Sequence, residues 1–262
     1  MYCAMMVDIK DSQKLKQDKR IKIQKKLIDV IALLNKTFVN QLKYKLVFNS
    51  GDSVQGLFYK PFDALKYYFS LKDLLYPYEV RLGLGVGSIV IDFENYDSNM
   101  QDGPAYHNAL SALKLAKKEN VDAIIETKTK LDYYVNELLY ILFILENSQS
   151  NNQKDVNNLI NLLLPVGYKI PFTDLQKYLL TNISQYDKIE ISNLDEYDLI
   201  DKKSKFSKNI YMPSLALKIS KLLGTSRENI RQIIKNGKIN EIRKLRELIL
   251  KFLEEKENEI TT

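Results

Sequence analysis

The sequence of 262 residues contains one cysteine, one histidine and no tryptophan. A lone cysteine, Cys3, excludes an internal disulfide framework and is typical of proteins that fold in a reducing compartment. A lone histidine, His107, excludes a multi-histidine metal site, so a bound metal would need mainly carboxylate ligands. With 9 glycines and 6 prolines, the chain is neither fibrous nor disordered in composition. The composition predicts a folded, cytoplasmic protein.

Long hydrophobic runs are also missing. The most apolar stretch, LLYILFIL at 138–145, is far shorter than the roughly 20 residues that a membrane-spanning helix needs. The first charged residue, Asp8, comes too early in the chain for a signal peptide. We therefore expect no membrane partner.

The net charge of +6 is unevenly distributed along the chain. From Lys202 to Lys251 there are 14 basic residues against three acidic ones, a net charge of +11, so the rest of the chain carries −5. The stretch from Leu131 to Asp201 alone carries −7. A basic segment on a mildly acidic protein indicates a phosphate-bearing partner. A solvated, lysine-rich face is the alternative explanation.

The apolar pattern of the first half predicts alternating strands and helices. Strands are expected at 2–9, 45–49, 54–59, 80–91 and 123–126. Helices are expected at 21–38, 61–75 and 103–118. This order favours an α+β fold, an α/β sandwich in which the helices cover one face of a mixed sheet.

The second half is predicted to be mainly helical. Helices are expected at 131–147, 155–164 and 172–180, with a loop at 148–153 and a strand or irregular segment at 186–200. The expected domains are 1–130, a linking region 131–210 that carries no interpretable motif, and 211–255.

The stretch LALKISKLLGTSRENIRQIIKNG has the pattern of a helix-turn-helix. The expected buried positions are Leu215, Ile219, Leu222, Leu223, Ile230, Ile233 and Ile234. Gly224 stands at the turn, where glycine tolerates a left-handed conformation, and Ser226 suits the N-cap of the second helix. Ser220 replaces the alanine usual in such motifs and is small enough to fit. The pattern predicts DNA binding, with a helical hairpin for protein contacts as the alternative.

The outward positions of the second helix carry side chains that suit base edges. They are Ser226, Arg227, Arg231, Gln232 and Lys235. Four further basic residues are expected to contact phosphates, which position the protein without reading sequence. They are Lys218, Lys221, Lys238 and Arg243.

Two aspartates stand where predicted strands end, Asp8 in MMVDIKDS and Asp52 in NSGDSVQGLF. If the first strand and the hairpin are neighbours, both carboxylates meet at one sheet edge, where oxygen ligands suit Mg²⁺. Each aspartate could instead be a turn or cap residue.

These segments resemble known families in their order along the chain. A strand ending in Asp-Ile, a Gly-Asp hairpin, VRLGLGVGSI and DGPAYHNALSALKLA resemble the catalytic domain of class III nucleotide cyclases, and the hairpin also resembles the turn of diguanylate cyclases. With the helix-turn-helix, the chain looks most like the SatD family of bacterial proteins, over 1–126 and 211–240. The resemblance implies a ferredoxin-like, palm-type domain.

The resemblance also implies site residues. Asp8, Asp52 and the backbone carbonyl of Ile9 would hold Mg²⁺ or Mn²⁺, and Asn108 would be the catalytic asparagine, although it lies one place off the usual spacing. Nucleotide or phosphate contacts would come from Gly51, Ser53, Asp102 and Gly103. The helix at 103–118 has no arginine to stabilise transition-state charge, so binding without efficient turnover is expected.

Three other features are expected to be structural. Gly83, Gly85 and Gly87 lie within a strand and precede no helix directly, so they are not a dinucleotide-binding motif. Cys3 is expected in the core and His107 as a packed or capping side chain.

Taken together, the sequence predicts a homodimeric DNA-binding regulator whose cyclase-like domain binds a nucleotide or phosphate ligand with Mg²⁺. One alternative is an active nucleotidyl cyclase that its helix-turn-helix localises. The other is a protein-interaction module that has lost both activities.

Overall fold

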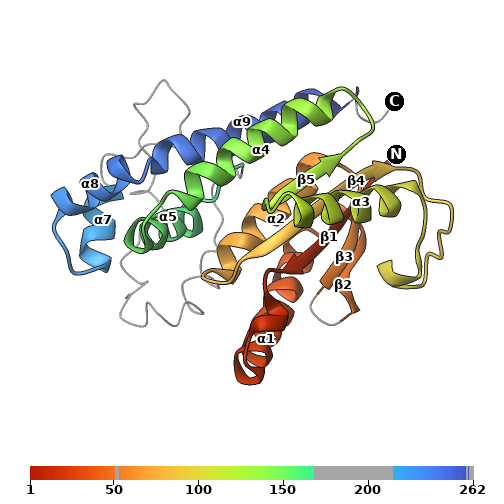
Figure 1. Cartoon of the computed structure of the whole chain (residues 1–262), viewed down its shortest axis with the longest axis horizontal. Helices are drawn as coiled ribbons and strands as arrows, with labels where there is room; N and C mark the ends of the chain where they lie inside the picture. Colours follow the sequence, from red (N-terminus) through yellow and green to blue (C-terminus); the bar gives the residue numbers. More distant parts are fainter. Residues whose placement is uncertain (51–52, 168–214, 258, 260–262) are drawn as a thin grey trace. The chain divides into compact units, whose positions relative to one another are not determined.

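The computed structural model describes residues 1–50, 53–167, 215–257 and 259 (Figure 1). The strands are β1 (Tyr2–Ile9), β2 (Leu42–Ser50), β3 (Ser53–Phe58), β4 (Val80–Gly87) and β5 (Ala123–Glu126). The helices are α1 (Gln17–Thr37), α2 (Pro61–Leu75), α3 (Pro104–Lys118), α4 (Leu131–Asn147), α5 (Asn151–Leu163), α7 (Leu215–Leu222), α8 (Arg227–Asn236) and α9 (Ile239–Glu255). The segments at 172–180 and 186–200 lie outside the described residues.

The chain forms two compact units, which we call the sheet unit and the helical unit. The sheet unit comprises Met1–Phe143 with Leu248–Thr262, and the helical unit comprises Ile144–Glu247. Helices α4 and α9 supply residues to both, so the units do not follow the expected division into three consecutive segments.

The sheet unit is built on five strands in the order β2-β3-β1-β4-β5. Central β1 runs antiparallel to both β3 and β4, whereas β5 runs parallel to β4. The register places Asp8 opposite Ser53 of β3 and Arg81 of β4. The expected mixed sheet is confirmed, and its register brings residues together that are far apart in the sequence.

Helices cover both faces of this sheet, so the expectation of helices on one face was wrong (Figure 1). On one face, Phe58 of β3 packs its ring 5.4 Å from that of Tyr67 in α2. On the other, Ala4 of β1 belongs to the same buried cluster as Ala105 and Ala109 of α3. Successive strand residues point to opposite faces, and the alternating apolar residues of β1 therefore supply both cores.

The glycines of β4 explain why α3 lies so close to the sheet. A Cβ atom added at Gly85 would stand 2.0 Å from the backbone nitrogen of Ala109, and one at Gly83 would stand 2.3 Å from its oxygen. The strand ends at Gly87, earlier than expected, and Ile91 forms only an isolated bridge with Asp102. The glycines are needed because they let the backbone of α3 approach β4 closely, which is the structural role expected for them.

In the helical unit, α5 begins at Asn151, inside the segment expected to be a loop. Its start is fixed by a capping box, in which Ser150 and Gln153 each bond the other's backbone nitrogen. This helix packs Leu159 and Leu163 into one core with Ile219 of α7 and Ile230 of α8. Helix α5, which lies in the region 131–210 that carries no interpretable motif, therefore supports the helix-turn-helix.

Candidate functional site

A cavity of about 590 Å³ opens in the sheet unit at the carboxyl end of β1. Its charged and polar lining includes Asp8, Lys14, Asn49, Ser53, Arg81 and Lys117. We call it the Asp8 cavity. Its residues come from four strands, one helix and the turn after β1, and side chains distant in sequence thus converge there.

Asp8 and Lys117 form the central ion pair of this cavity. The Lys117 Nζ lies 2.7 Å from Asp8 Oδ2, and the Asp8 side chain is 15% exposed while that of Lys117 is 47% exposed. Asp11 pairs with Lys14 at 2.6 Å, and this hydrogen bond and the lysine charge hold the pKa of Asp11 below its usual value. Both carboxylates in the lining are therefore matched by an ammonium group.

Arg81 adds a third cation, and its side chain is held in place. Its Nε donates to the carbonyl of Val121 at 3.1 Å and its Nη2 donates to Asn120 Oδ1 at 3.1 Å. Three cations therefore face two carboxylates, with hydroxyl and amide groups from Ser53 and Asn49 beside them. An arrangement with excess positive charge and neutral donors suits a phosphate-bearing ligand.

The fit of a divalent metal depends on Asp52. Within 1–50, 53–167, 215–257 and 259, no three His, Cys, Asp or Glu side chains converge on a point that could hold a metal ion. Asp8 contributes one carboxylate, which Lys117 engages. Gly51 and Asp52 lie outside the described residues, although Asn49 and Ser53 on either side line the cavity. The paired-aspartate site stays a prediction. Ile9 also lines the cavity.

Three other predicted residues do not line the Asp8 cavity. Gly103 and Lys117 stand near opposite ends of α3, about 20 Å apart along a helix of this length. Asp102 Oδ1 accepts from the Gly103 nitrogen at 2.8 Å, and the Asn108 amide donates to the carbonyl of Val86 at 2.8 Å. The Asn108 bond joins α3 to β4, whereas the Asp102 carboxylate bonds the residue that precedes α3. His107 Nε2 lies 3.0 Å from Asp102 Oδ1.

Gly103 itself is needed for its backbone. Its φ of 150° is in the region that favours glycine, and an added Cβ would lie 2.7 Å from the Val90 nitrogen. Cys3 is fully buried, as expected, and burial raises the pKa of its thiol. Both features are structural.

Sequence reasoning missed the cavity's cations. Lys14, Arg81 and Lys117 belong to no motif, and only the sheet register and the path of α3 bring them to Asp8. The one available signal was Arg81 itself, the single charged residue in an otherwise apolar and glycine-rich β4.

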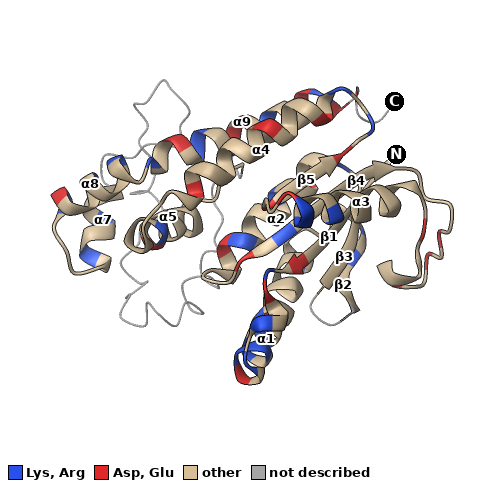
Figure 2. Cartoon of the chain, in the orientation of Figure 1, with Lys and Arg blue, Asp and Glu red and all other residues tan. Residues whose placement is uncertain are grey.

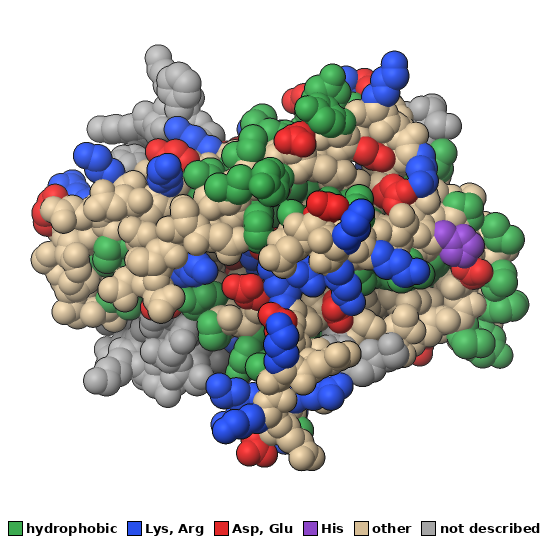
Figure 3. All heavy atoms as spheres, viewed as in Figure 1, with side chains coloured by type: hydrophobic (Ala, Val, Ile, Leu, Met, Phe, Trp, Pro, Cys, Tyr) green, Lys and Arg blue, Asp and Glu red, His purple; other side chains and the backbone are tan. Residues whose placement is uncertain are grey.

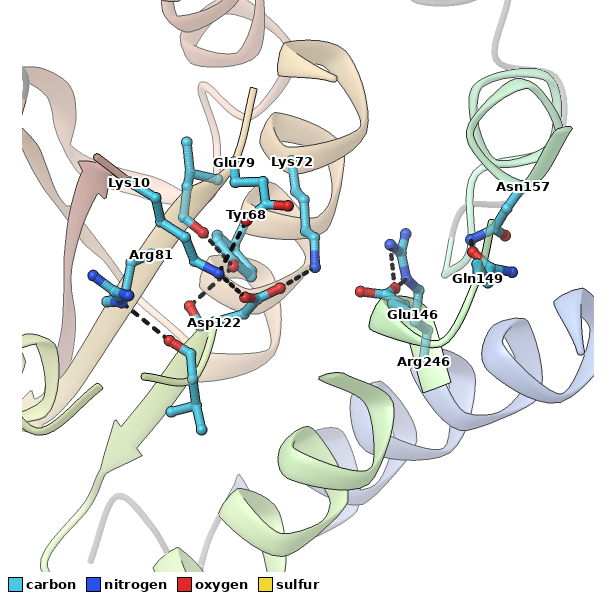
Figure 4. A network of polar contacts seen from close by, with 12 residues as sticks. Lys10, Tyr68, Lys72, Glu79, Arg81, Asp122, Glu146, Gln149, Asn157 and Arg246 are labelled. Atoms are coloured by element: carbon cyan, nitrogen blue, oxygen red, sulfur yellow. Dashed lines mark hydrogen bonds and ion pairs between the residues drawn. The ribbon is translucent and has the colours of Figure 1, made fainter. Parts of the chain in front are cut away.

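A second charged cluster lies close by, around Asp122 at the start of β5 (Figure 4). Lys10 and Lys72 both form ion pairs with its carboxylate, and the Tyr68 hydroxyl lies 3.1 Å from its backbone carbonyl. Burial raises the pKa of Asp122, but the two ammonium groups outweigh burial, so that its pKa lies below the usual value. This cluster ties β5 and α2 to the end of β1.

The helix-turn-helix has the predicted local geometry. Gly224 has a φ of 61°, in the left-handed region, and nothing lies within 4 Å of an added Cβ. Ser226 is the N-cap of α8 and its hydroxyl accepts from the Asn229 nitrogen at 3.1 Å. Ile230 is completely buried, and Ser220 is buried with its hydroxyl donating to the Leu217 carbonyl at 2.7 Å.

Most of the predicted DNA contacts lie on the surface of the helical unit. The exposed ones are Lys221, Ser226, Arg227, Arg231, Gln232, Lys235 and Lys238. The Nζ atom of Lys218 is buried, which does not suit a phosphate contact. Arg243 was wrongly expected to contact phosphate, since it is 1% exposed and donates at 2.7 Å to Asn161 Oδ1 and to the Leu164 carbonyl.

A buried ion pair anchors the helical unit (Figure 4). Arg246 donates to Glu146 Oε1 at 2.7 Å from its Nη2 and at 3.0 Å from its Nε. Gln149 donates to the Gly237 carbonyl at 2.6 Å, just after α8 ends. These contacts link the segment before α5 to the helices on either side of Gly237.

The sequence profile of the SatD family matches residues 2–197. The chain belongs to the SatD family. The match covers the sheet unit up to Phe143 and α5, and it ends before α7 and α8 begin. The matched residues include the whole lining of the Asp8 cavity, while the helix-turn-helix lies beyond them.

Two solved structures of bacterial light-regulated adenylyl cyclases are similar to this SatD family protein. One has 14% identity, covers 47% of this chain and 74% of that chain, and has a TM-score of 0.38. The other has 13% identity, covers 47% and 42%, and has the same TM-score. Comparison with curated proteins gives no significant match. No helix in the described part of the chain is long and apolar enough to cross a membrane.

Proposed function

We propose that this SatD family protein is a DNA-binding regulator whose sheet unit binds a nucleotide or another phosphate-bearing ligand. The observation that carries the proposal is the surface of α8. Arg227, Arg231 and Lys235 follow one another at intervals of four residues and are all exposed, while Ile230 on a different face of the helix is buried. A helix of 10 residues with such a basic side fits the major groove, which is about 12 Å wide.

The arrangement behind α8 supports this role. A recognition helix has to be held rigidly, and α8 packs on α7 and on α5 through one continuous apolar core. Arg227, Arg231 and Gln232 are suited to base edges, whereas Lys221 and Lys238 suit phosphates. We propose that the chain acts as a homodimer, because helix-turn-helix proteins commonly read paired half-sites.

The DNA test uses a duplex selected from a random library with the full-length protein. Replacing Arg227 and Arg231 by Ala should weaken specific binding by tenfold or more, because each bidentate base contact contributes about 1–3 kcal/mol. The matched control is Lys114→Ala with Lys118→Ala, which removes two exposed charges from α3. Equal affinity of the arginine variant and the control in a gel-shift titration would contradict the proposed docking.

The proposed ligand of the sheet unit is argued from the Asp8 cavity. Lys117 and Arg81 provide the charge for a phosphate, and Ser53 and Asn49 provide neutral hydrogen-bonding groups. Mg²⁺ or Mn²⁺ would bind together with the nucleotide through Asp8 and, by the sequence prediction, Asp52. When bound, such a metal would neutralise phosphate charge.

The ligand test is calorimetric titration with each nucleoside triphosphate, with and without Mg²⁺. Lys117→Gln should weaken binding about tenfold, whereas Lys114→Gln, three residues earlier on α3, should not change it. Asp52→Asn should remove the dependence on Mg²⁺. Absence of binding by every triphosphate would contradict a nucleotide ligand.

The same incubations test the enzymatic alternative. A cyclic or linear nucleotide product that disappears in Asp52→Asn would make the sheet unit a nucleotidyl cyclase. We expect binding without efficient turnover, since Asn108 is engaged with the Val86 carbonyl and α3 contains no arginine.

A further inference from the structure

The amino-terminal half of α1 is a second strongly basic part of the described surface. Between 14 and 26 there are seven basic residues and one acidic residue, Asp18. Six of the basic residues are exposed, and one of them, Lys14, pairs with Asp11. We call the other five the α1 basic surface: Lys16, Lys19, Arg20, Lys22 and Lys25. Figure 2 shows Lys and Arg positions, coloured blue, gathered along this helix, and Figure 3 shows blue side chains in the same region.

These five side chains are not neutralised within the described part of the chain. None of them forms an ion pair with a described carboxylate, and like charges face one another at spacings of three or four residues, as at Lys16 and Arg20. Lys16, Lys19 and Arg20 also stand at the end of α1 where the helix dipole is positive, with Asp18 as the only acid in the first turn. Such repulsion costs stability unless an anionic partner offsets it.

A membrane surface does not fit this helix. Interfacial helices bury their apolar side among lipids, but the apolar side of α1 is already used inside the sheet unit. Ile23 and Leu27 are each 1% exposed, and Leu34 is fully buried. The partner must therefore be recognised by charge at the outer side of the helix.

The composition of α1 also argues against single-stranded nucleic acid. Proteins that bind single strands stack bases on aromatic side chains, and α1 contains no Phe, Tyr or Trp. From Lys16 to Lys25 the helix extends about 14 Å. Duplex DNA presents its phosphates regularly along such a length and needs no stacking platform.

We propose that the α1 basic surface binds the phosphate backbone of double-stranded DNA, as a contact separate from α8. The contact is independent of sequence, because lysine side chains on phosphates position a protein without reading bases. Its role is to hold the sheet unit on DNA near the site that α8 reads.

The test is made with the full-length protein carrying Arg227→Ala and Arg231→Ala, so that the proposed base contacts of these two arginines are absent throughout. In this background, Lys16, Lys19, Arg20, Lys22 and Lys25 are replaced by Gln. The matched control replaces five exposed lysines elsewhere in the sheet unit by Gln: Lys36, Lys114, Lys118, Lys128 and Lys130. Binding to a random 20-base-pair duplex is measured as a function of salt concentration.

We expect the α1 variant to bind at least tenfold more weakly than the control at low salt. The slope of log K against log salt should also be shallower by about 0.9 for every phosphate that the variant no longer neutralises. Equal affinity and equal slope in the two variants overturn the proposal. So does a clear preference for a single strand of the same length, or binding to phosphatidylserine vesicles with none to duplex DNA.

Folding of the variants is checked by circular dichroism and thermal unfolding. A second variant, with Lys16, Lys19, Lys22 and Lys25 replaced by Arg, keeps the charge and should bind like the background protein. If the five-residue glutamine variant does not fold, the slope of log K against log salt is measured instead for Lys19→Gln and for Lys22→Gln. A slope equal to that of the background protein in both single variants overturns the proposal. Since α8 carries the same two substitutions in every sample, failure here leaves the α8 proposal untouched.

Discussion

The helix-turn-helix and the Asp8 cavity differ in how far apart in the sequence their residues lie. All the features of the former, from Leu215 to Gly237, fall in one continuous stretch, and its turn and cap follow from local residue preferences. The cavity joins Asp8 of β1 to Arg81 of β4 and Lys117 of α3 through the sheet register. The helix-turn-helix is specified by residues that are close together in the sequence. The Asp8 cavity exists only if the whole sheet unit folds.

The largest effect is expected where the helical unit depends on a long-range contact of its own. Glu146→Ala would leave the guanidinium of Arg246 buried without its carboxylate, which typically costs about 3–5 kcal/mol. Urea unfolding measures this loss. As a control, replacing both residues together, with Leu and Met, should recover most of it. If Glu146→Ala lowers the free energy of unfolding by less than about 1 kcal/mol, the fold of α7 and α8 does not depend on this ion pair.

The Asp122 cluster provides a pH test within the sheet unit. Asp122→Asn removes two ion pairs with lysines and should cost about 1.5–3 kcal/mol at pH 7. Because the pKa of Asp122 is lowered in the folded protein, its contribution is complete above the unfolded pKa of about 3.9 and is lost as pH falls further. Wild type and variant should therefore converge in stability below about pH 4. A constant difference from pH 7 to pH 3 would contradict this interpretation of the cluster.

Substitutions of one glycine in each region allow a direct comparison of the sheet unit with the helix-turn-helix. Gly85→Ala places a Cβ against the backbone of α3 and should cost about 1–3 kcal/mol. Gly224→Ala has open space but a left-handed backbone, so it should cost about 1–2 kcal/mol. Asparagine tolerates that conformation and should recover stability at Gly224 but not at Gly85, as thermal unfolding would show. Recovery at both positions would mean that α3 can move away from the sheet.

The smallest effect is expected at the cap of α8. Ser226→Ala removes the hydroxyl that accepts from the Asn229 nitrogen and should cost about 1 kcal/mol, while Ser226→Asp should keep the cap. The two variants are compared by thermal unfolding. If Ala and Asp have equal stability, the cap does not determine where α8 begins.

Helix ends, turns and caps could be predicted from the sequence, because they depend on residues that are close together in the chain. Pro61 and Leu75 bound α2 as expected, and Gly224 and Ser226 mark the turn and the cap. Ser150 and Gln153 form a capping box that is visible in the sequence, and α5 therefore begins at Asn151 rather than at the predicted Asp155.

Long-range packing could not be predicted in the same way. Arg243 has the composition of a phosphate contact, yet Asn161 and the Leu164 carbonyl hold it inside the helical unit. Asn108 and Asp102 match a family pattern, but in the fold they bond backbone groups away from the Asp8 cavity. Local spacing does not determine which basic or polar side chains the core will bury.

The most direct test of the central proposal, a DNA-binding regulator that responds to a nucleotide, is to measure DNA affinity with and without nucleotide. The dissociation constant of the selected duplex is determined in the absence and in the presence of each nucleoside triphosphate with Mg²⁺, at fixed salt. We predict a change of fivefold or more with at least one triphosphate, abolished by Lys117→Gln and matched by an equal effect of DNA on nucleotide affinity. The same dissociation constant with every triphosphate at saturation would contradict the proposal.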